Sequence, residues 1–109
     1  MNYEDFLTNE VFPLVKGKSV LELGALNFRI TDCIKNAGAS HVETVDPFGE
    51  ANFRGTANDY YNTTVDKFDV VTCMGLLYHL HSPFHLLELI INKSEPDTLI
   101  VETGPTVLI

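Results

Sequence analysis

The chain has 109 residues, a formal net charge of −8, 45% hydrophobic residues and 20% charged residues. This length suits one domain with a single core, and no apolar run approaches the roughly 20 residues that cross a bilayer. The acidic start lacks the basic segment of a signal peptide, so we expect one cytoplasmic domain over residues 1–109, not a membrane protein.

The distribution of charge and the positions of the cysteines argue against further classes of protein. The seven lysines and arginines are spread along the chain, and without a basic stripe nucleic acid is not the expected partner. Cys33 and Cys73 lie far apart with no paired spacing near either, which argues against a zinc knuckle or a disulfide scaffold. We expect both to be reduced, buried, small apolar residues.

The first sixteen residues predict a helical cover of the domain. Apolar residues recur there at helical spacing after an Asn2 cap: Tyr3, Phe6, Leu7 and Val11. Pro13 is expected to break or end this helix.

Strands and helices then alternate. Short apolar or alternating runs predict strands over residues 19–23, 41–45, 51–57, 68–74 and 98–102. A helix over residues 28–38, ended by Gly38, carries one apolar face: Ile30, Cys33, Ile34 and Ala37. A later helix has Ser82 as its cap, Pro83 as its first residue and an expected inward stripe: Phe84, Leu87, Ile90 and Ile91.

This alternation predicts the α/β fold class, a three-layer αβα Rossmann-like open sheet that is mainly parallel with right-handed crossovers. Ligands of such sheets bind outside the carboxyl ends of the strands, where the strand order reverses. The strands at 19–23 and 68–74 should flank that point. The link after Asp46 is too short for a full crossover helix and must be a loop or a single turn.

Three stretches in this order, "VLELG", "ETVD" and "FDVVTCMGLLYHLHSPFHLLELI", resemble the class I S-adenosylmethionine-dependent methyltransferases over residues 17–102. The resemblance implies S-adenosyl-L-methionine as methyl donor and a small-molecule acceptor. Family members generally continue after the fifth strand with a helix and an antiparallel strand pair, whereas only "TGPTVLI" follows here. We therefore expect the sheet to lack that pair, and the unpaired edge to self-associate as a homo-oligomer through residues 98–109.

The methyl donor carries no phosphates, so it needs no glycine cradle. Leu26 and Phe28 stand where a pyrophosphate loop would carry glycine, while Gly24, with Ala25, allows the methionine half to approach the main chain. The resemblance places Glu22 at the ligand amino group. The alternative for Glu22 is a salt bridge at a strand end.

Asp46 closes the second strand, where a carboxylate can accept both ribose hydroxyls. Its alternative is a plain Asp-Pro turn. The resemblance assigns further residues: Pro47 and Phe48 to the adenine side, Asn58 or Asp59 to the adenine amino group, and Met74 and Gly75 to the methionine amino group. Packing in the core is the alternative for Met74.

Tyr78 and His79 follow, close to the transferable methyl group. His79 is a candidate general base because imidazole titrates near neutral pH, and the alternative is a histidine bonded to backbone at a helix entry. His81 and His85 have a metal-binding spacing, but His79 would have to be the third ligand, and we expect no metal.

Three rival functions are considered, and the first two remain open. The domain could hold S-adenosylmethionine without transferring a group, alone or as a subunit completed by a partner, or it could cleave that molecule. Dinucleotide-dependent oxidoreduction is disfavoured because Leu26 and Phe28 replace loop glycines and a second mononucleotide half is missing.

Overall fold

The computed structural model describes Asp5 and residues 7–25, 29–63, 65–74, 82–102 and 107–108. Its helices, with η marking a π-helical turn, are η1 (Leu7–Val11), α2 (Phe12–Val15), α3 (Arg29–Asn36), α4 (Ala57–Tyr61), α5 (Pro83–Leu89) and η3 (Ile90–Ser94). Its strands are β1 (Ser19–Leu23), β2 (His41–Val45), β3 (Val70–Met74), β4 (Thr98–Glu102) and β5 (Val107–Leu108).

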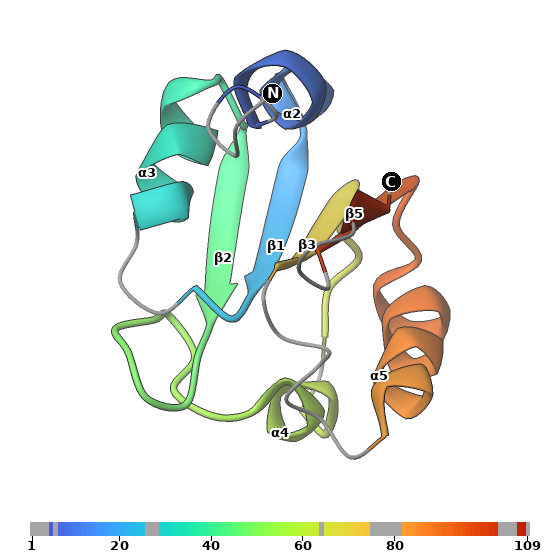
Figure 1. The fold of residues 1–109 in the computed structure, drawn as a ribbon. Coiled ribbons are helices and arrows are strands. Elements are labelled where there is room, and N and C mark those ends of the chain that lie inside the picture. The colour runs from blue at the N-terminus through green and yellow to red at the C-terminus, as the bar shows by residue number, and fades with distance from the viewer. Residues whose placement is uncertain are drawn as a thin grey trace.

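One five-stranded sheet runs through the molecule in the order β2-β1-β3-β4-β5 (Figure 1). The first four strands of this order are parallel, which confirms the predicted open α/β sheet. β5 pairs antiparallel with the end of β4, through Val101 with Leu108 and Glu102 with Val107. The expectation of an unpaired last strand is therefore wrong at this end, because the chain turns back and gives the backbone groups of β4 partners from its own sequence.

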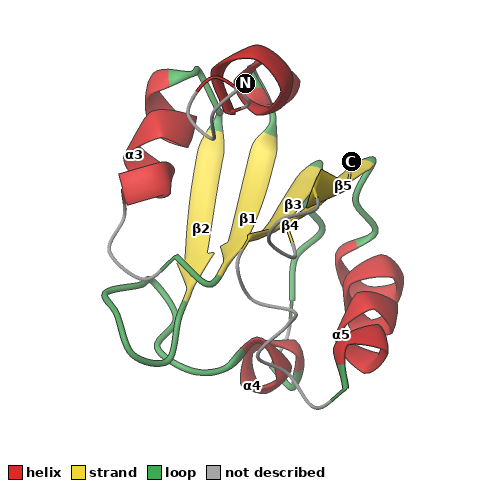
Figure 2. Cartoon of the chain, viewed as in Figure 1, coloured by secondary structure: helices red, strands yellow, loops and turns green. Residues whose placement is uncertain are grey.

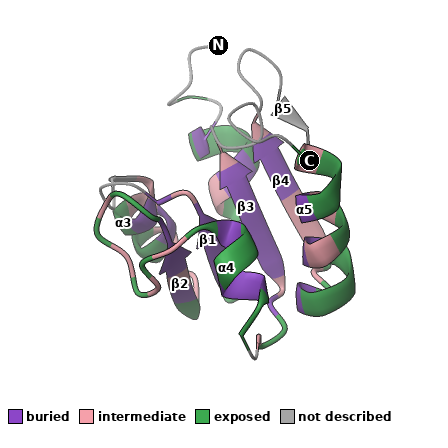
Figure 3. Cartoon of the chain, turned by 90° about the horizontal axis from the view of Figure 1, so that it is seen from below, coloured by how far each residue is buried: buried purple, intermediate pink, exposed green. Residues whose placement is uncertain are grey.

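Helices cover both faces of the sheet, so the predicted three-layer arrangement is confirmed (Figure 2). η1, α2 and α3 lie over one face, whose core has these members: Leu7, Val11, Val15, Val20, Ile34, Val42, Val70 and Ile100. α4, α5 and η3 lie over the other, whose larger core includes Leu21, Leu23, Val45, Tyr61, Val71, Cys73, Leu86 and Ile90. Strand residues alternate between the two cores, and the outward faces of the helices are exposed (Figure 3).

The predicted third strand is reduced to a single parallel bridge between Phe53 and Val45. Asn52 stabilises this bridge through two hydrogen bonds with Thr44. The backbone N–H of Thr44 donates to Asn52 Oδ1 at 3.0 Å, and the backbone N–H of Asn52 donates to Thr44 Oγ1 at 2.9 Å. The connection from Asp46 to Thr56 contains no helix, as its length predicts.

The N-terminal cover differs from a simple helix that stops at a proline. Leu7, Val11 and Val15 are buried at intervals of four residues, across η1 and α2. Pro13 lies in the first turn of α2, where a missing N–H leaves no helix bond unmade, so the helix continues to Val15.

The inward stripe expected for the helix after Ser82 is wrong at two of its four positions. Phe84 is 79% exposed and Ile91 is 58% exposed, whereas Leu86 and Ile90 are fully buried. Ser82 is at the N-cap position and Pro83 begins α5, as predicted, but the Ser82 side chain makes no capping bond. The buried face is thus set by packing on the sheet, which rotates the helix relative to its most apolar stripe.

Both cysteines are free thiols; Cys73 is buried and Cys33 half-buried. Burial raises the pKa of the Cys73 thiol to about 12, as expected of an inert core residue. No helix in the described part of the chain combines the length and apolar character that crossing a bilayer requires.

A buried hydrogen bond joins α4 to η3 and gives a test of the larger core. The hydroxyls of Tyr61 and Ser94, both with 0% exposure, lie 2.8 Å apart. Tyr61→Phe should destabilise the protein by about 1–3 kcal/mol, because it leaves the Ser94 hydroxyl buried without a partner. Urea denaturation would measure this loss. Adding Ser94→Ala should recover part of it, and strictly additive losses would contradict the coupling.

Candidate functional site

The carboxyl ends of β1, β2 and β3 meet at one edge of the sheet, at the lower end of β1 and β2 in Figure 1. β1 is the strand from which the chain order departs in both directions, to β2 on one side and β3 on the other. This is the switch point at which open α/β sheets bind ligands, and it is the place that the sequence predicts.

Gly24 forms the turn after β1. Its φ of 84° lies in the left-handed region that glycine adopts without strain. The Gly24 and Ala25 amides both donate to the Val45 carbonyl, at 2.7 and 3.3 Å, which ties the turn to the end of β2. Gly24 is therefore required by backbone conformation, and its main chain lies beside the next predicted site residue, Asp46.

Asp46 is 5% exposed and follows β2 directly. Its Oδ1 accepts the amides of Phe48 at 2.8 Å and Gly49 at 2.6 Å, so the carboxylate closes a tight turn. The predicted alternative, an Asp-Pro turn, is thus present in the structure. In this turn Pro47 is exposed and Phe48 is 93% exposed. The turn also holds the Asp46 carboxylate at the carboxyl edge of the sheet.

Glu22 is also 5% exposed and lies one residue before the end of β1. The Thr31 hydroxyl of α3 donates a hydrogen bond to its Oε1, and among the side chains that the structure describes no basic group forms the salt bridge of the predicted alternative. Burial raises the pKa of Glu22, and the negative charges of Asp32 and Asp46 act in the same direction. The Thr31 hydrogen bond and the positive charge of Lys35 oppose this shift.

Asn58 and Asp59 are exposed on α4. Asp59 forms a capping box with Thr56: its amide donates to Thr56 Oγ1 at 3.0 Å, and its Oδ2 accepts the Thr56 amide at 3.3 Å. This gives Asp59 a structural role that the sequence analysis did not assign.

The cap can be tested by Thr56→Ala. The change should cost about 1 kcal/mol of unfolding free energy, since the helix loses the acceptor for the Asp59 amide. Thr56→Ser keeps that acceptor and should restore most of the loss. A thermal melt that cannot separate alanine from serine would contradict the role of the box.

Of the remaining residues considered in the sequence analysis, Met74 and His85 lie in the described part of the chain and the others do not. Met74, half-buried at the end of β3, packs against the core beneath η1, α2 and α3. Gly75, Tyr78, His79 and His81 lie outside the described residues. His85 is exposed on α5, and no cluster of three metal-ligating side chains occurs among the described residues.

Two site residues were missed by sequence reasoning, Thr31 and Thr72. Thr72 is opposite Glu22 in the β1–β3 register, with 0% exposure, and Thr31 is 1% exposed. A signal was present in the sequence, because Glu22 and Thr72 are each the one polar residue inside an apolar run, and the register aligns them.

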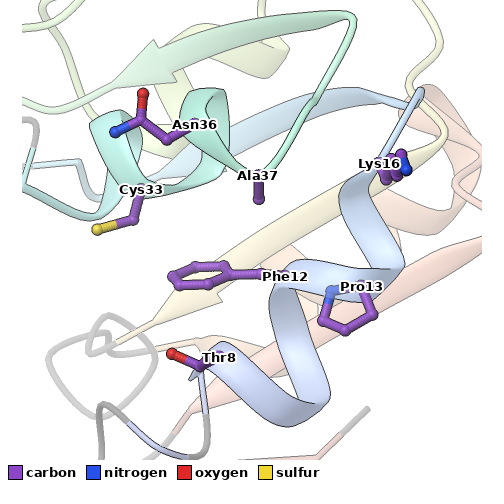
Figure 4. Close-up of a pocket in the computed structure, with 7 residues that line it drawn as sticks. All are labelled: Thr8, Phe12, Pro13, Lys16, Cys33, Asn36 and Ala37. Atoms are coloured by element: carbon purple, nitrogen blue, oxygen red, sulfur yellow. The ribbon is translucent and has the colours of Figure 1, made fainter.

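A groove of about 450 Å³ lies elsewhere, between η1, α2 and α3 (Figure 4). The Phe12 ring of α2 lies below Cys33 and Ala37 of α3, and Lys16 and Asn36 also line the groove. Phe12 lies in α2 and Lys16 directly after it, before the amino end of β1, while Cys33, Asn36 and Ala37 lie at the end of α3 and directly after it. The groove is therefore remote from the carboxyl edge that carries Asp46.

Comparisons with known proteins agree with the fold. A family model described as a methyltransferase domain matches residues 3–107. The ubiquinone biosynthesis O-methyltransferase of Aeromonas salmonicida (strain A449) is 29% identical over 96 residues, which cover 73% of this chain and 40% of that protein. The chain thus spans about two fifths of the length of this relative. With its four parallel strands, its helices on both faces and the match over nearly its whole length, the chain belongs to the class I S-adenosylmethionine-dependent methyltransferases.

Proposed function

We propose that the chain binds S-adenosyl-L-methionine at the carboxyl edge of β1, β2 and β3 and transfers its methyl group to a small acceptor. The observation that carries the proposal is the Asp46 carboxylate, fixed by two main-chain amides at the end of β2 beside the Gly24 turn. A carboxylate in this position suits the two hydroxyls of a ribose.

The residues at the edge fit the methyl donor. Gly24 and Ala25 would admit its methionine half to the main chain, with Glu22, Met74 and Gly75 on the side of the amino group. Asp46 would accept the ribose hydroxyls. Pro47 and the exposed Phe48 would lie along adenine, with Asn58 or Asp59 near the adenine amino group.

The bound sulfonium supplies an activated methyl group, so the chain must mainly align the acceptor and exclude water. The bond from sulfur to methyl breaks as the bond from acceptor to methyl forms, and the sulfur leaves as a neutral thioether. Tyr78 and His79 would face the acceptor. His79 would take the acceptor's proton where the acceptor is a hydroxyl.

The name of the relative, an O-methyltransferase, favours a hydroxyl as the acceptor atom. We also propose a cytoplasmic location, consistent with the composition and charge of the chain.

Self-association through residues 98–109 remains our proposal for the edge of the sheet. β5 pairs with Val101 and Glu102, and in the described part of the chain no strand pairs with the outer side of residues 98–100. A dimer measured by size-exclusion chromatography with light scattering would support the proposal. A clean monomer at high protein concentration would contradict it.

A calorimetric titration of the purified chain with S-adenosylmethionine and S-adenosylhomocysteine tests the binding proposal, followed by mass spectrometry of the products. We expect both ligands to bind, and S-adenosylhomocysteine to form when an acceptor is present. Binding without product would favour a binding module or a subunit that a partner completes. Another nucleoside product would favour cleavage, and a chain that ignores both ligands would contradict the proposal.

A further inference from the structure

Three buried polar residues of β1, α3 and β3 lie around Glu22, and we call them the interior polar cluster: Glu22, Thr31 and Thr72. Their exposures are 5%, 1% and 0%. Glu22 and Thr72 are register partners on the neighbouring strands β1 and β3, so their side chains leave the same face of the sheet side by side. Thr31, from the first turn of α3, closes the cluster by donating its hydroxyl to Glu22 Oε1.

The Thr72 hydroxyl is the unexplained member. Its Oγ1 is completely buried and has no hydrogen-bond partner among the described residues. Buried hydroxyls in folded proteins nearly always have a partner, so the Thr72 hydroxyl is free to donate to an acceptor beside it. The register places this hydroxyl next to a carboxyl group, which becomes a stronger acceptor when it ionises.

The surroundings of Glu22 disfavour its charged form. Asp46 from the end of β2 and Asp32 from α3 repel a negative charge there, Lys35 from α3 attracts one, and β3 contributes the uncharged Thr72. Burial is the largest influence and raises the pKa of Glu22. A positive group brought to this carboxyl would therefore change its protonation.

We propose that Thr31 and Thr72 are positioning residues for Glu22, and that a ligand ammonium group binding at Glu22 displaces the proton that the carboxyl carries in the ligand-free protein. The inference rests on the proposed function, which brings the methionine half of the methyl donor to this carboxyl. The O–H bond of the carboxyl breaks, its proton passes to solvent, and the ammonium keeps its own protons. Thr31 holds Oε1 in place, and Thr72 gives the new carboxylate a second hydroxyl donor.

The test is calorimetric binding of S-adenosylhomocysteine, which carries the same ammonium but has no methyl group to transfer. Titrations between about pH 5 and pH 8, in two buffers with different heats of ionisation, give both the affinity and the number of protons released. We expect the affinity of the wild-type chain to rise up to tenfold per pH unit below a midpoint, with one proton released there, and to level off above it.

Thr31→Val removes the hydrogen bond that favours the charged carboxyl, so the midpoint should move to higher pH. Affinity should fall about threefold to tenfold within that window, and remain close to that of the wild type above it. Thr72→Val should move the midpoint in the same direction, and serine at either position should restore it. Thr63→Val, at an exposed threonine that bonds the Tyr60 carbonyl, is the matched control and should leave the midpoint unchanged.

The outcomes separate this inference from the proposed function. Binding without proton release, or affinities of Thr31→Val and the wild type that run parallel at every pH, would overturn the inference alone. A wild-type chain that binds no ligand at any pH would overturn both. If the valine variants fail to fold, Glu22→Gln serves instead: loss of proton release in that variant supports the inference, and persistent release contradicts it.

Discussion

Asp46→Ala should weaken the binding of S-adenosylhomocysteine by at least about a hundredfold. Hydrogen bonds to a charged group contribute about 1.5–3 kcal/mol each, and the carboxylate would lose two of them to the ribose. The same change removes the acceptor for the Phe48 and Gly49 amides, so part of the loss would come from the turn itself. Calorimetry at neutral pH measures the affinity directly.

Asp46→Asn distinguishes the two contributions. An asparagine keeps an oxygen for the two amides but carries no charge, so the turn should survive while affinity still falls by about tenfold or more. Asp97→Ala, at an exposed aspartate before β4, is the control and should bind as the wild type does. A folded Asp46→Ala chain with undiminished affinity would contradict the placement of the ribose.

Glu22→Gln should have opposite effects on ligand binding and on stability. Binding should weaken because an amide cannot form an ion pair with the ligand ammonium. The ligand-free protein should become more stable at neutral pH, since the variant removes a carboxyl whose pKa burial raises above the ordinary value of a glutamate. The amide oxygen can still accept the Thr31 hydroxyl.

The pH dependence of the stability effect has a definite sign. A folded-state pKa above the unfolded value gives a stabilising contribution that is complete below the unfolded pKa and is lost as pH rises through the folded pKa. The Tm of the wild-type chain should therefore decrease relative to the Tm of Glu22→Gln as pH increases from about 4 towards 8. Each kcal/mol of lost unfolding free energy should lower Tm by about 4–8 °C. Melting curves of both proteins across this range decide the matter. A Tm difference that is the same at every pH would show that the carboxyl does not titrate differently on folding.

The sequence predicts the four parallel strands well because each of them has a local signature. β-branched runs such as Val70 and Val71 mark strands buried on both faces, and Gly24 marks a turn that needs a positive φ. The positions of Glu22 and Asp46 at the carboxyl edge then follow from the parallel arrangement alone. These features depend on residues that are neighbours in the chain.

Other features depend on contacts between distant segments, which no local pattern contains. Phe84 belongs to the most apolar stripe of its helix, yet Leu86 is the residue that packs on the sheet, because the docking of α5 sets its rotation. Thr31 and Glu22 meet only once α3 has returned over β1. β5 pairs antiparallel with the end of β4, and the Gly-Pro pair in the intervening "TGPT" is a turn signal, but it does not fix which residues of the two strands pair.

The link between Thr44 and Asn52 has a consequence for how this protein can evolve. Their paired hydrogen bonds and the Phe53 bridge anchor the far end of the loop that starts at Asp46, so its conformation does not depend on the exposed residues between the two anchors. Substitutions at Phe48 or its exposed neighbours can therefore accumulate at little cost to folding. Selection for a different nucleoside could act on that short stretch while the rest of the domain stayed constant.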